Sequence, residues 1–299
     1  ATPPIAYIRD GGEPVPDSIS CTRIFDYEHD KFYEEREQMW VNVLDINVDS
    51  LQVWAAGPGD TTAIVYINML TPVGTPDPRG GGHYPVVRLI SGAALDYPLT
   101  IATRHPLYTR GNYNSTGWQP AALIADSYTV LSPAWNDTQH QVACVNRRMY
   151  GGLCAAPTTA QSVGSNTSIY AAVLAGHSGT LCDHHAGVNN GNCTVASNSA
   201  NYGGGLENFP RFLEDFRTSN STSSATNTVT YYGSLVSLFY NQQGTGDWIY
   251  TNNTTNTGQY YSPPTRDWQF DTRFEYPENL PPGTPVVGNV IHTAFRPVF

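Results

Sequence analysis

Residues 98–138 read PLTIATRHPLYTRGNYNSTGWQPAALIADSYTVLSPAWNDT. Short runs of alternating apolar residues recur in this stretch, and Pro, Gly or Asn ends each run. Such runs are typical of short strands that are bounded by turns. The stretch therefore predicts a mainly β fold.

Strand candidates of the same kind occur along most of the chain, at residues 41–48, 51–55, 62–67, 86–90, 99–103, 121–125, 128–131, 168–175 and 228–240. In residues 168–175, both faces of an extended strand carry apolar or small side chains, which is typical of a strand stacked inside a solenoid or a sandwich. We therefore expect an irregular right-handed β-helix, or solenoid, with long loops. Because no strict repeat period emerges, a β-sandwich is the alternative.

One short capping helix is predicted at residues 208–216, NFPRFLEDF. Its apolar residues follow the i, i+3, i+4, i+7 spacing of a helical stripe, and its two acids after Leu213 would lie on the outer side. The acidic residues 28–37 are consistent with a short helix or a loop. The Pro-rich tail from Tyr261 predicts an irregular strap that Trp268 and Phe270 hold in place.

Composition divides the chain into three parts. Residues 1–20 are rich in Pro and Gly and predict an extended arm. Residues 21–85 form an N-terminal β-rich region, and residues 86–299 form the solenoid-like body with its C-terminal strap.

The charge balance narrows the classes of partner. Only 13% of the residues are charged and the net charge is −10, so the chain repels phosphate backbones and nucleic acid is excluded as a partner. No run of about 18 apolar residues occurs, so we expect no membrane span in this chain. No signal peptide is visible, so an exported protein would carry its targeting segment outside this sequence.

Cysteines and glycosylation motifs indicate an oxidising, extracellular compartment. Cys144 and Cys154 flank one short loop, Cys182 and Cys193 flank another, and each pair predicts a local disulfide. Cys21 is left over, either as a buried thiol or as an intermolecular link. The Asn-x-Ser/Thr motif, which makes its asparagine a candidate for a covalent glycan, occurs at Asn114, Asn136, Asn166, Asn192, Asn220, Asn252 and Asn253.

Two segments carry weak metal-ligand patterns. Asp183, His184 and His185 lie inside the Cys182–Cys193 loop, but adjacent histidines converge poorly on one metal, so a disulfide-closed surface loop is favoured. The acidic side chains of residues 26–30 faintly resemble a calcium loop through Asp26, Glu28 and Asp30. They lack the turn glycine and the ligand spacing, so a solvated face is favoured and no cofactor is expected.

No catalytic constellation stands out. The chain has no G-x-S-x-G elbow and no HExxH motif. A polysaccharide-degrading enzyme could use Asp126, Asp267 and Asp271 together with Arg88. The alternative is that Asp126 and Asp271 cap turns. The aromatic residues Trp118, Trp135 and Trp248 could stack on sugars, although core or interface positions are more usual for tryptophan.

Six sequence blocks in a consistent order carry a family resemblance: LTIATRHPLYTRGNYN, PAALIADSYTVLSPAWND, GGGLENFPRFLEDF, GSLVSLFYNQQGTGDW, YSPPTRDWQFD and NLPPGTP. From about Val86 to Pro285, the chain resembles the C-terminal region of large bacterial PilX-like or prepilin-like pilus-assembly proteins. The resemblance implies a surface-exported, pilus-related protein with a β-solenoid-like body, and it implies no catalytic residues. The chain shows neither a prepilin leader nor an apolar N-terminal helix, so we expect a processed fragment or a different mode of assembly.

These observations predict a secreted, disulfide-containing glycoprotein that acts as a structural subunit of an extracellular filament or pilus-like surface assembly. Its expected partners are copies of itself in a homopolymer, which residues 1–20 could connect by adding a strand to a neighbour. The alternatives are a carbohydrate-binding surface adhesin and a polysaccharide-degrading β-helix lyase or hydrolase. Binding to sugars without turnover would indicate the adhesin, and release of soluble sugars would indicate the enzyme.

Overall fold

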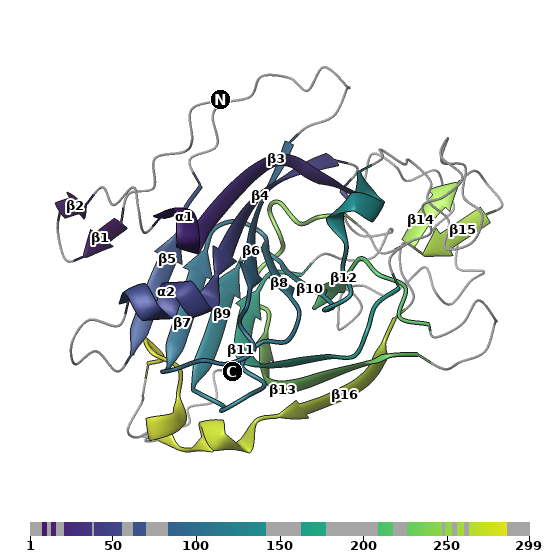
Figure 1. Cartoon of the computed structure of the whole chain (residues 1–299). Helices are drawn as coiled ribbons and strands as arrows, with labels where there is room; N and C mark the ends of the chain where they lie inside the picture. The colour runs from purple at the N-terminus through teal and green to yellow at the C-terminus, as the bar shows by residue number, and fades with distance from the viewer. Residues whose placement is uncertain are drawn as a thin grey trace, which may run out of the picture.

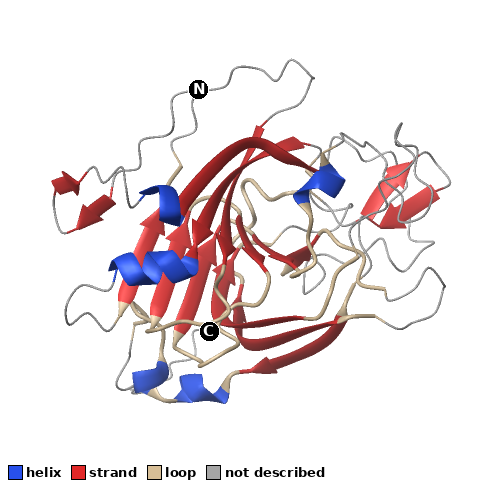
Figure 2. Cartoon of the chain, viewed as in Figure 1, coloured by secondary structure: helices blue, strands red, loops and turns tan. Residues whose placement is uncertain are grey.

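The structure is a computed structural model that is dominated by strands, with a few short helices at the periphery (Figure 2). It describes residues 8–10, 13–15, 21–37, 39–55, 62–69, 83–141, 163–177, 209–217, 226–246, 249–252, 256–259 and 263–285. The mainly β expectation is confirmed.

Most strands belong to two six-stranded sheets. Sheet I has the order β12-β10-β8-β6-β4-β3 and is parallel except for the antiparallel pair β3–β4. Its strands are β3 (Phe25–Glu34), β4 (Met39–Asn47), β6 (His83–Ile90), β8 (Leu107–Arg110), β10 (Tyr128–Leu131) and β12 (Arg211–Phe212).

Sheet II has the order β16-β13-β11-β9-β7-β5 and is parallel throughout. Its strands are β5 (Ala63–Ile67), β7 (Leu99–Thr103), β9 (Ala121–Ala125), β11 (Thr167–Ala175), β13 (Thr228–Val236) and β16 (Thr265–Phe270). From β4 to β13, consecutive strands alternate between sheet I and sheet II, and each return to a sheet adds a strand beside the previous one (Figure 1).

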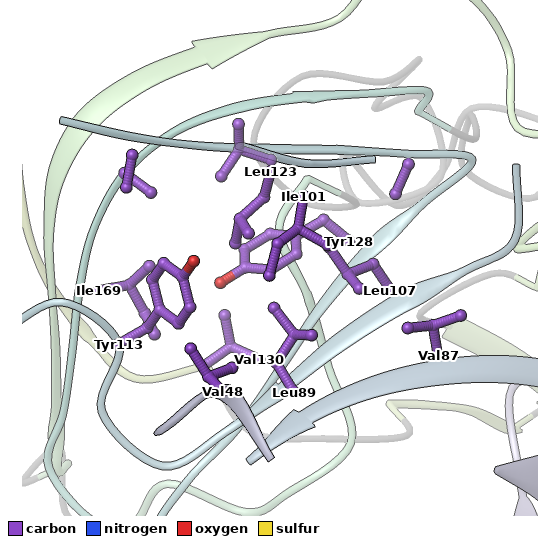
Figure 3. Close-up of a cluster of buried hydrophobic side chains, with 14 of the residues drawn as sticks. Val48, Val87, Leu89, Ile101, Leu107, Tyr113, Leu123, Tyr128, Val130 and Ile169 are labelled. Atoms are coloured by element: carbon purple, nitrogen blue, oxygen red, sulfur yellow. The ribbon is translucent and has the colours of Figure 1, made fainter. Parts of the chain in front are cut away.

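The core lies between the two sheets. In β11, alternate residues from Thr167 to Ala175 are buried and the residues between them are half-buried, as the sequence pattern predicts. Ile101 and Leu123 are in-register neighbours in sheet II, and Figure 3 shows them with Leu107 and Val130 of sheet I among the side chains that fill this space. Burying each such side chain contributes roughly 1.5–3 kcal/mol.

The helices are short: α1 (Cys21–Ile24), α2 (Val48–Ala55) and the 3₁₀ turns η1 (Asp137–His140), η3 (Thr272–Glu275) and η4 (Pro277–Asn279). Helix α2 replaces the strand expected at residues 51–55. Asn47 accepts a hydrogen bond from the Ser50 amide at 3.1 Å, as a helix cap does. Val48 and Leu51 are buried at a spacing of three residues, which the strand interpretation overlooked.

The helix predicted at residues 208–216 is wrong in its described part. Residues 209–217 are mainly extended, with a cis Phe209–Pro210 bond, and include β12. Every residue from Phe209 to Phe216 is buried, including Glu214 and Asp215, which were expected to face solvent. An amphipathic helix needs an exposed side, and this segment has none because its charged residues have buried partners.

Three further segments differ from the expectations. Residues 28–37 are mostly strand β3, and β8 is a strand that the sequence analysis did not predict. Of the expected strap, residues 265–270 form β16, and residues 271–285, which we call the strap below, run from its end with η3 and η4. Trp268 is half-buried in the sheet, whereas Phe270 is exposed and does not hold the strap down.

Two small hairpins complete the description: β1 (Ile8–Asp10) with β2 (Glu13–Val15), and β14 (Ile249–Asn252) with β15 (Asn256–Gln259). Apart from the first of these, the expected arm at residues 1–20 lies outside the described residues. The division at residues 21–85 and 86–299 stays a prediction. None of the helices in the described part of the chain is long and apolar enough to cross a membrane.

Candidate functional site

The outward face of sheet I carries a row of buried polar side chains. One residue from each of five neighbouring strands contributes to it, in register: Asp45, Arg88, Tyr108, Thr129 and Arg211. All five are buried, because Phe32 and Trp135 pack against this face in a second apolar cluster. Buried charges require partners, so the partners of these side chains show whether the row has a structural or a chemical role.

Arg88 forms the centre of an ion-pair triad. Its guanidinium donates to both oxygens of Asp45, at 2.6 and 2.7 Å, and to both oxygens of Asp137, at 2.6 and 3.1 Å. Trp135 Nε1 also donates to Asp137, at 2.6 Å. Burial by itself raises the pKa of Asp137, but the hydrogen bonds and charge of Arg88, together with the hydrogen bond from Trp135 and the charge of Arg110, outweigh it and lower the pKa below its usual value. The triad links β4, β6 and η1.

Arg211 binds a loop formed by residues 241–246. Its Nη2 donates to Glu37, and its Nη1 donates to the Gly244 carbonyl at 2.5 Å. The Gly246 amide donates to both oxygens of Glu37 at 2.8 Å, and Arg36 donates to the Gly246 carbonyl at 3.0 Å. Sheet I, the turn after β3 and this loop are therefore joined by one ionic network.

Asp126 anchors the other side of the same loop. Its carboxylate accepts three backbone N–H groups, from Gln242 at 2.6 Å and from Gln243 and Gly244 at 2.9 Å. A Cβ atom on Gly244 would lie 2.1 Å from the Ser127 hydroxyl, so the loop packs this closely only with glycine there. Asp126 therefore accepts backbone N–H groups, as predicted, but they belong to a loop that is distant in the sequence and not to its own turn.

Glu34 is the buried carboxylate of this region that has no normal hydrogen bond. Desolvation, together with the charge of Glu37, raises its pKa to about 7, although Arg211 and Arg36 act in the opposite direction. Within the described residues, neither of its oxygens has a hydrogen-bond partner of normal geometry, and the same holds for the hydroxyls of Tyr84 and Tyr108. Such groups are usually satisfied by buried water.

A small pocket opens beside this network. It is lined by Tyr33, Glu35, Arg36, His140 and Leu213, and it has about 10 Å³ of free space. That space holds roughly one water molecule. The pocket is too small for a sugar residue.

The remaining acids considered for catalysis lie on other elements. Asp271 caps η3 through the Arg273 amide at 3.1 Å and pairs with the Arg273 guanidinium at 2.7 Å, which confirms its turn-capping prediction. Asp267 lies on β16 and accepts from Thr230 at 3.4 Å. Arg88 belongs to sheet I, so the structure does not bring these acids together around it.

The outward face of sheet II has a different composition from that of sheet I. One row across five strands is apolar: Tyr66, Ala102, Ile124, Leu174 and Val236. The strap contacts this side of the molecule at both of its ends. Trp118 stacks under Arg273, 4.1 Å from its ring centre, and the Thr100 hydroxyl donates to the Pro282 carbonyl at 2.7 Å.

The two ends of sheet II are open. Within the described residues, β5 pairs with β7 alone and β16 pairs with β13 alone (Figure 1). The core-facing residues of central strands, such as Leu99 and Leu123, are fully buried, but Val65 of β5 and Trp268 of β16 are only half-buried. In the part of the chain that the structure describes, the core is therefore incompletely covered at both ends.

The weak metal sites gain no support from the structure. Asp183, His184 and His185 lie outside the described residues, as do Cys144, Cys154, Cys182 and Cys193. Cys21 lies in α1. Asp26, Glu28 and Asp30 lie on β3, where Glu28 pairs with Lys31 and Asp30 contacts His83 at 3.3 Å. Among the residues that the structure describes, no three metal-binding side chains come together.

One glycosylation candidate does not fit the fold. Asn114 is fully buried, and its Nδ2 donates to the carbonyls of Gln119 at 2.7 Å and Tyr170 at 2.8 Å, so the folded chain has no room for a glycan there. Asn136 and Asn166 are exposed. The side chains of the other candidates lie outside the described residues: Asn192, Asn220, Asn252 and Asn253.

The tryptophans proposed for sugar stacking have other contacts. Trp135 is buried and stacks on His140, with ring centres 4.2 Å apart. Trp118 is half-buried between Arg273 and Phe274. Trp248 lies outside the described residues.

Sequence reasoning missed the network around Glu34, Glu37 and Arg211. The available signal was weak: Arg211 interrupts the apolar segment FPRFL in a chain where charge is scarce, and two glycines punctuate NQQGTG at residues 241–246. Neither feature indicates which partner a buried charge has. Comparisons with protein-family models, with curated proteins and with solved structures give no match.

Proposed function

We propose that this protein is a structural subunit of an extracellular filament or pilus-like surface assembly and associates with copies of itself. The observation that supports the proposal is that, among the described residues, no strand covers either end of sheet II, where core-facing residues such as Val65 and Trp268 are half-buried. Incompletely covered cores and open strand edges are liabilities for a monomer and contact surfaces for a polymer.

The fold that suits this role is an irregular right-handed β-helix. Strands that alternate between two sheets, with each sheet growing by one parallel strand per circuit, are the arrangement expected of a solenoid. Crossovers between parallel strands of one sheet are right-handed in about 98% of proteins. A solenoid has two ends by construction, and each end of a parallel sheet offers an edge to a neighbour.

The use of charge also favours a structural role. Arg88, Arg211 and Asp126 each have partners that tie distant segments together. The PilX-like resemblance, the paired cysteines and the exposed motifs at Asn136 and Asn166 support export, disulfide formation and glycosylation of this subunit.

Polymer formation is directly testable. Sedimentation velocity over a hundredfold range of protein concentration, with negative-stain microscopy of the same samples, should reveal oligomers that lengthen with concentration. A monodisperse monomer at every concentration would contradict the proposal. Deleting residues 1–20 tests whether the arm is the connector: if polymers persist in a folded truncation, it is not.

A further inference from the structure

Within the described residues, the outer edges of β5 and β16 have no strand neighbour, and the directions of their backbone amides follow from the hydrogen bonds on the inner side. The Ala63 amide donates to the Pro98 carbonyl at 3.0 Å, toward β7. Because N–H directions alternate along a strand, the amides of Ile64 and Tyr66 point away from β7. At the other end, the Asp271 amide donates to the Gly233 carbonyl at 3.2 Å, toward β13, so the amides of Trp268 and Phe270 point away from it.

Each of these edges has exposed apolar side chains, two on β5 and one on β16. Ile64 and Tyr66 are 61% and 64% exposed on β5, and Phe270 is 56% exposed at the end of β16. Strand β5 contains neither a charged residue nor a proline, the devices that usually prevent an edge from pairing. Strand β16 differs, because it carries Arg266 and Asp267 and its exposed apolar surface is limited to Phe270.

The direction of the strands points to a second copy as the occupant of each edge. All six strands of sheet II are parallel, so a copy displaced along the stacking direction presents β16 parallel to β5. The two strands also match in length, with five and six residues. We propose that copies join head to tail, with β16 of one copy paired in parallel with β5 of the next. This contact rests on the proposed function and names its interface.

The alternation of side chains restricts the register. Core-facing residues must remain on the core side, which allows registers that differ by two residues, and the register that pairs most of both strands places Val65 opposite Trp268 and Ile67 opposite Phe270. The Tyr66 carbonyl then accepts from the Phe270 amide, and the Tyr66 amide donates to the Trp268 carbonyl. A contact between two different edges leaves one free edge at each end of the assembly, so it generates an open chain of copies unless the rotation between copies closes a ring.

The rival arrangement is a two-fold dimer through β5 alone. It would cover Ile64 and Tyr66 but leave β16 open, with Phe270 still exposed. A head-to-tail contact covers both ends with one interface, which is why we favour it.

Two proline variants separate these arrangements. Tyr66→Pro and Phe270→Pro each remove one outward-pointing amide and leave the bonds to β7 and β13 in place, a substitution that edge strands tolerate. Each variant alone should sediment as a folded monomer, with self-association weakened roughly 100-fold. An equimolar mixture should form dimers and stop there, because one intact β5 edge meets one intact β16 edge.

Side-chain variants control for loss of folding. Tyr66→Lys and Phe270→Lys keep the backbone amide and add a charge to the edge, so they should give the same pattern, including dimers on mixing. Ile124→Thr, on the outward face of the central strand β9, should leave association unchanged. Circular dichroism and thermal unfolding verify that each variant is folded.

The other outcomes overturn the contact in different ways. Polymers that persist in both proline and both lysine variants would exclude the β5–β16 contact and leave the proposed function intact. Dimers of Phe270→Pro alone, with monomers of Tyr66→Pro, would establish the two-fold arrangement instead. A wild-type protein that stays monomeric would overturn the contact and the proposed function together.

Discussion

The two sheets share one core and differ in their outward faces. On sheet I, the outward face is buried beneath a second layer and carries Asp45, Arg88 and Arg211 in ionic contacts. On sheet II, the outward face has an apolar row, and the strands at both ends have open edges with exposed side chains such as Tyr66.

This difference separates internal from external contacts. Buried ion pairs contribute little net stability over apolar packing, but breaking one partner is costly, so they fix which segments lie together. We therefore expect sheet I to determine how the chain is arranged, and the proposed function assigns the contacts with other copies to sheet II. Substitutions on the outward face of sheet I should affect folding, and those on the edges of sheet II should affect association.

The largest effect is expected from Arg88→Met. The change leaves Asp45 and Asp137 buried without their cation, which should lower the free energy of unfolding by about 3–5 kcal/mol. Urea denaturation measures this loss. The matched control is Arg273→Met, since Arg273 is 40% exposed in its pair with Asp271 and should cost less than about 1 kcal/mol. Equal losses would contradict the special role of the triad.

Glu34→Gln tests the pH dependence of the buried network. Because burial raises the pKa of Glu34 from 4.5 to about 7, the native state binds more protons than the unfolded state between these values. The contribution of Glu34 to the free energy of unfolding is therefore fully present below pH 4.5. As the pH rises through 7, this contribution decreases by roughly 3 kcal/mol.

The Glu34→Gln variant should lack the decrease in stability with rising pH that Glu34 causes, and it should be more stable than the wild type at pH 8. Thermal unfolding at pH 5 and pH 8 measures the difference between the two proteins. Burial also raises the pKa of Glu214 to about 7. The wild type and the Gln variant therefore share the decrease in stability with rising pH that Glu214 contributes. An unchanged pH profile in the variant would contradict the assignment to Glu34.

Gly244→Ala tests the loop that covers the network. The added methyl would lie 2.1 Å from the Ser127 hydroxyl and 2.5 Å from its Cβ, so the loop must shift away from Asp126 at a cost of about 1–3 kcal/mol. Gly117→Ala is the control: its φ of +65° strains alanine, but no atom lies within 4 Å, and the cost should be about 1 kcal/mol. Chemical denaturation compares the two, and a larger loss at Gly117 would argue against close packing of the loop.

The smallest effect concerns sheet II. Thr100→Val removes the hydroxyl that donates to the Pro282 carbonyl, which should cost about 1 kcal/mol and speed hydrogen exchange at the end of the strap. Thr230→Val removes only a long 3.4 Å contact to Asp267, so it should change neither the stability nor the hydrogen exchange of the strap. Identical exchange in both variants would show that the Thr100 contact does not hold the strap.

Sequence reasoning predicted the strands of the central body well. The predicted bounds 99–103, 121–125 and 128–131 coincide with β7, β9 and β10, because Pro, Asp and Ser end each short apolar run. Prediction was wrong where tertiary partners override local pattern. The spacing in residues 209–216 suits a helix, but the burial of Arg211 and Glu214 requires an extended chain.

The candidate site was predicted less well, for a physical reason. Arg88 was identified as noteworthy, but in combination with acids that lie elsewhere. Arg211 and Glu37 are 174 residues apart, and a single sequence does not reveal that two distant charges will be buried together. The turn cap at Asp271 was predictable, because an aspartate after a strand commonly accepts nearby backbone amides, whereas the amides that Asp126 accepts lie 116 to 118 residues away in the sequence.

The strap has a mechanical consequence. It begins at β16, the last strand of sheet II, and its Pro282 contacts Thr100, which is 182 residues away on β7 beside the first strand. A stack of strands that touch only their neighbours can fray from either end, one strand at a time. We therefore expect the strap to transmit a pull on β16 to β7, near the opposite end of the sheet, so that tension would load both ends together.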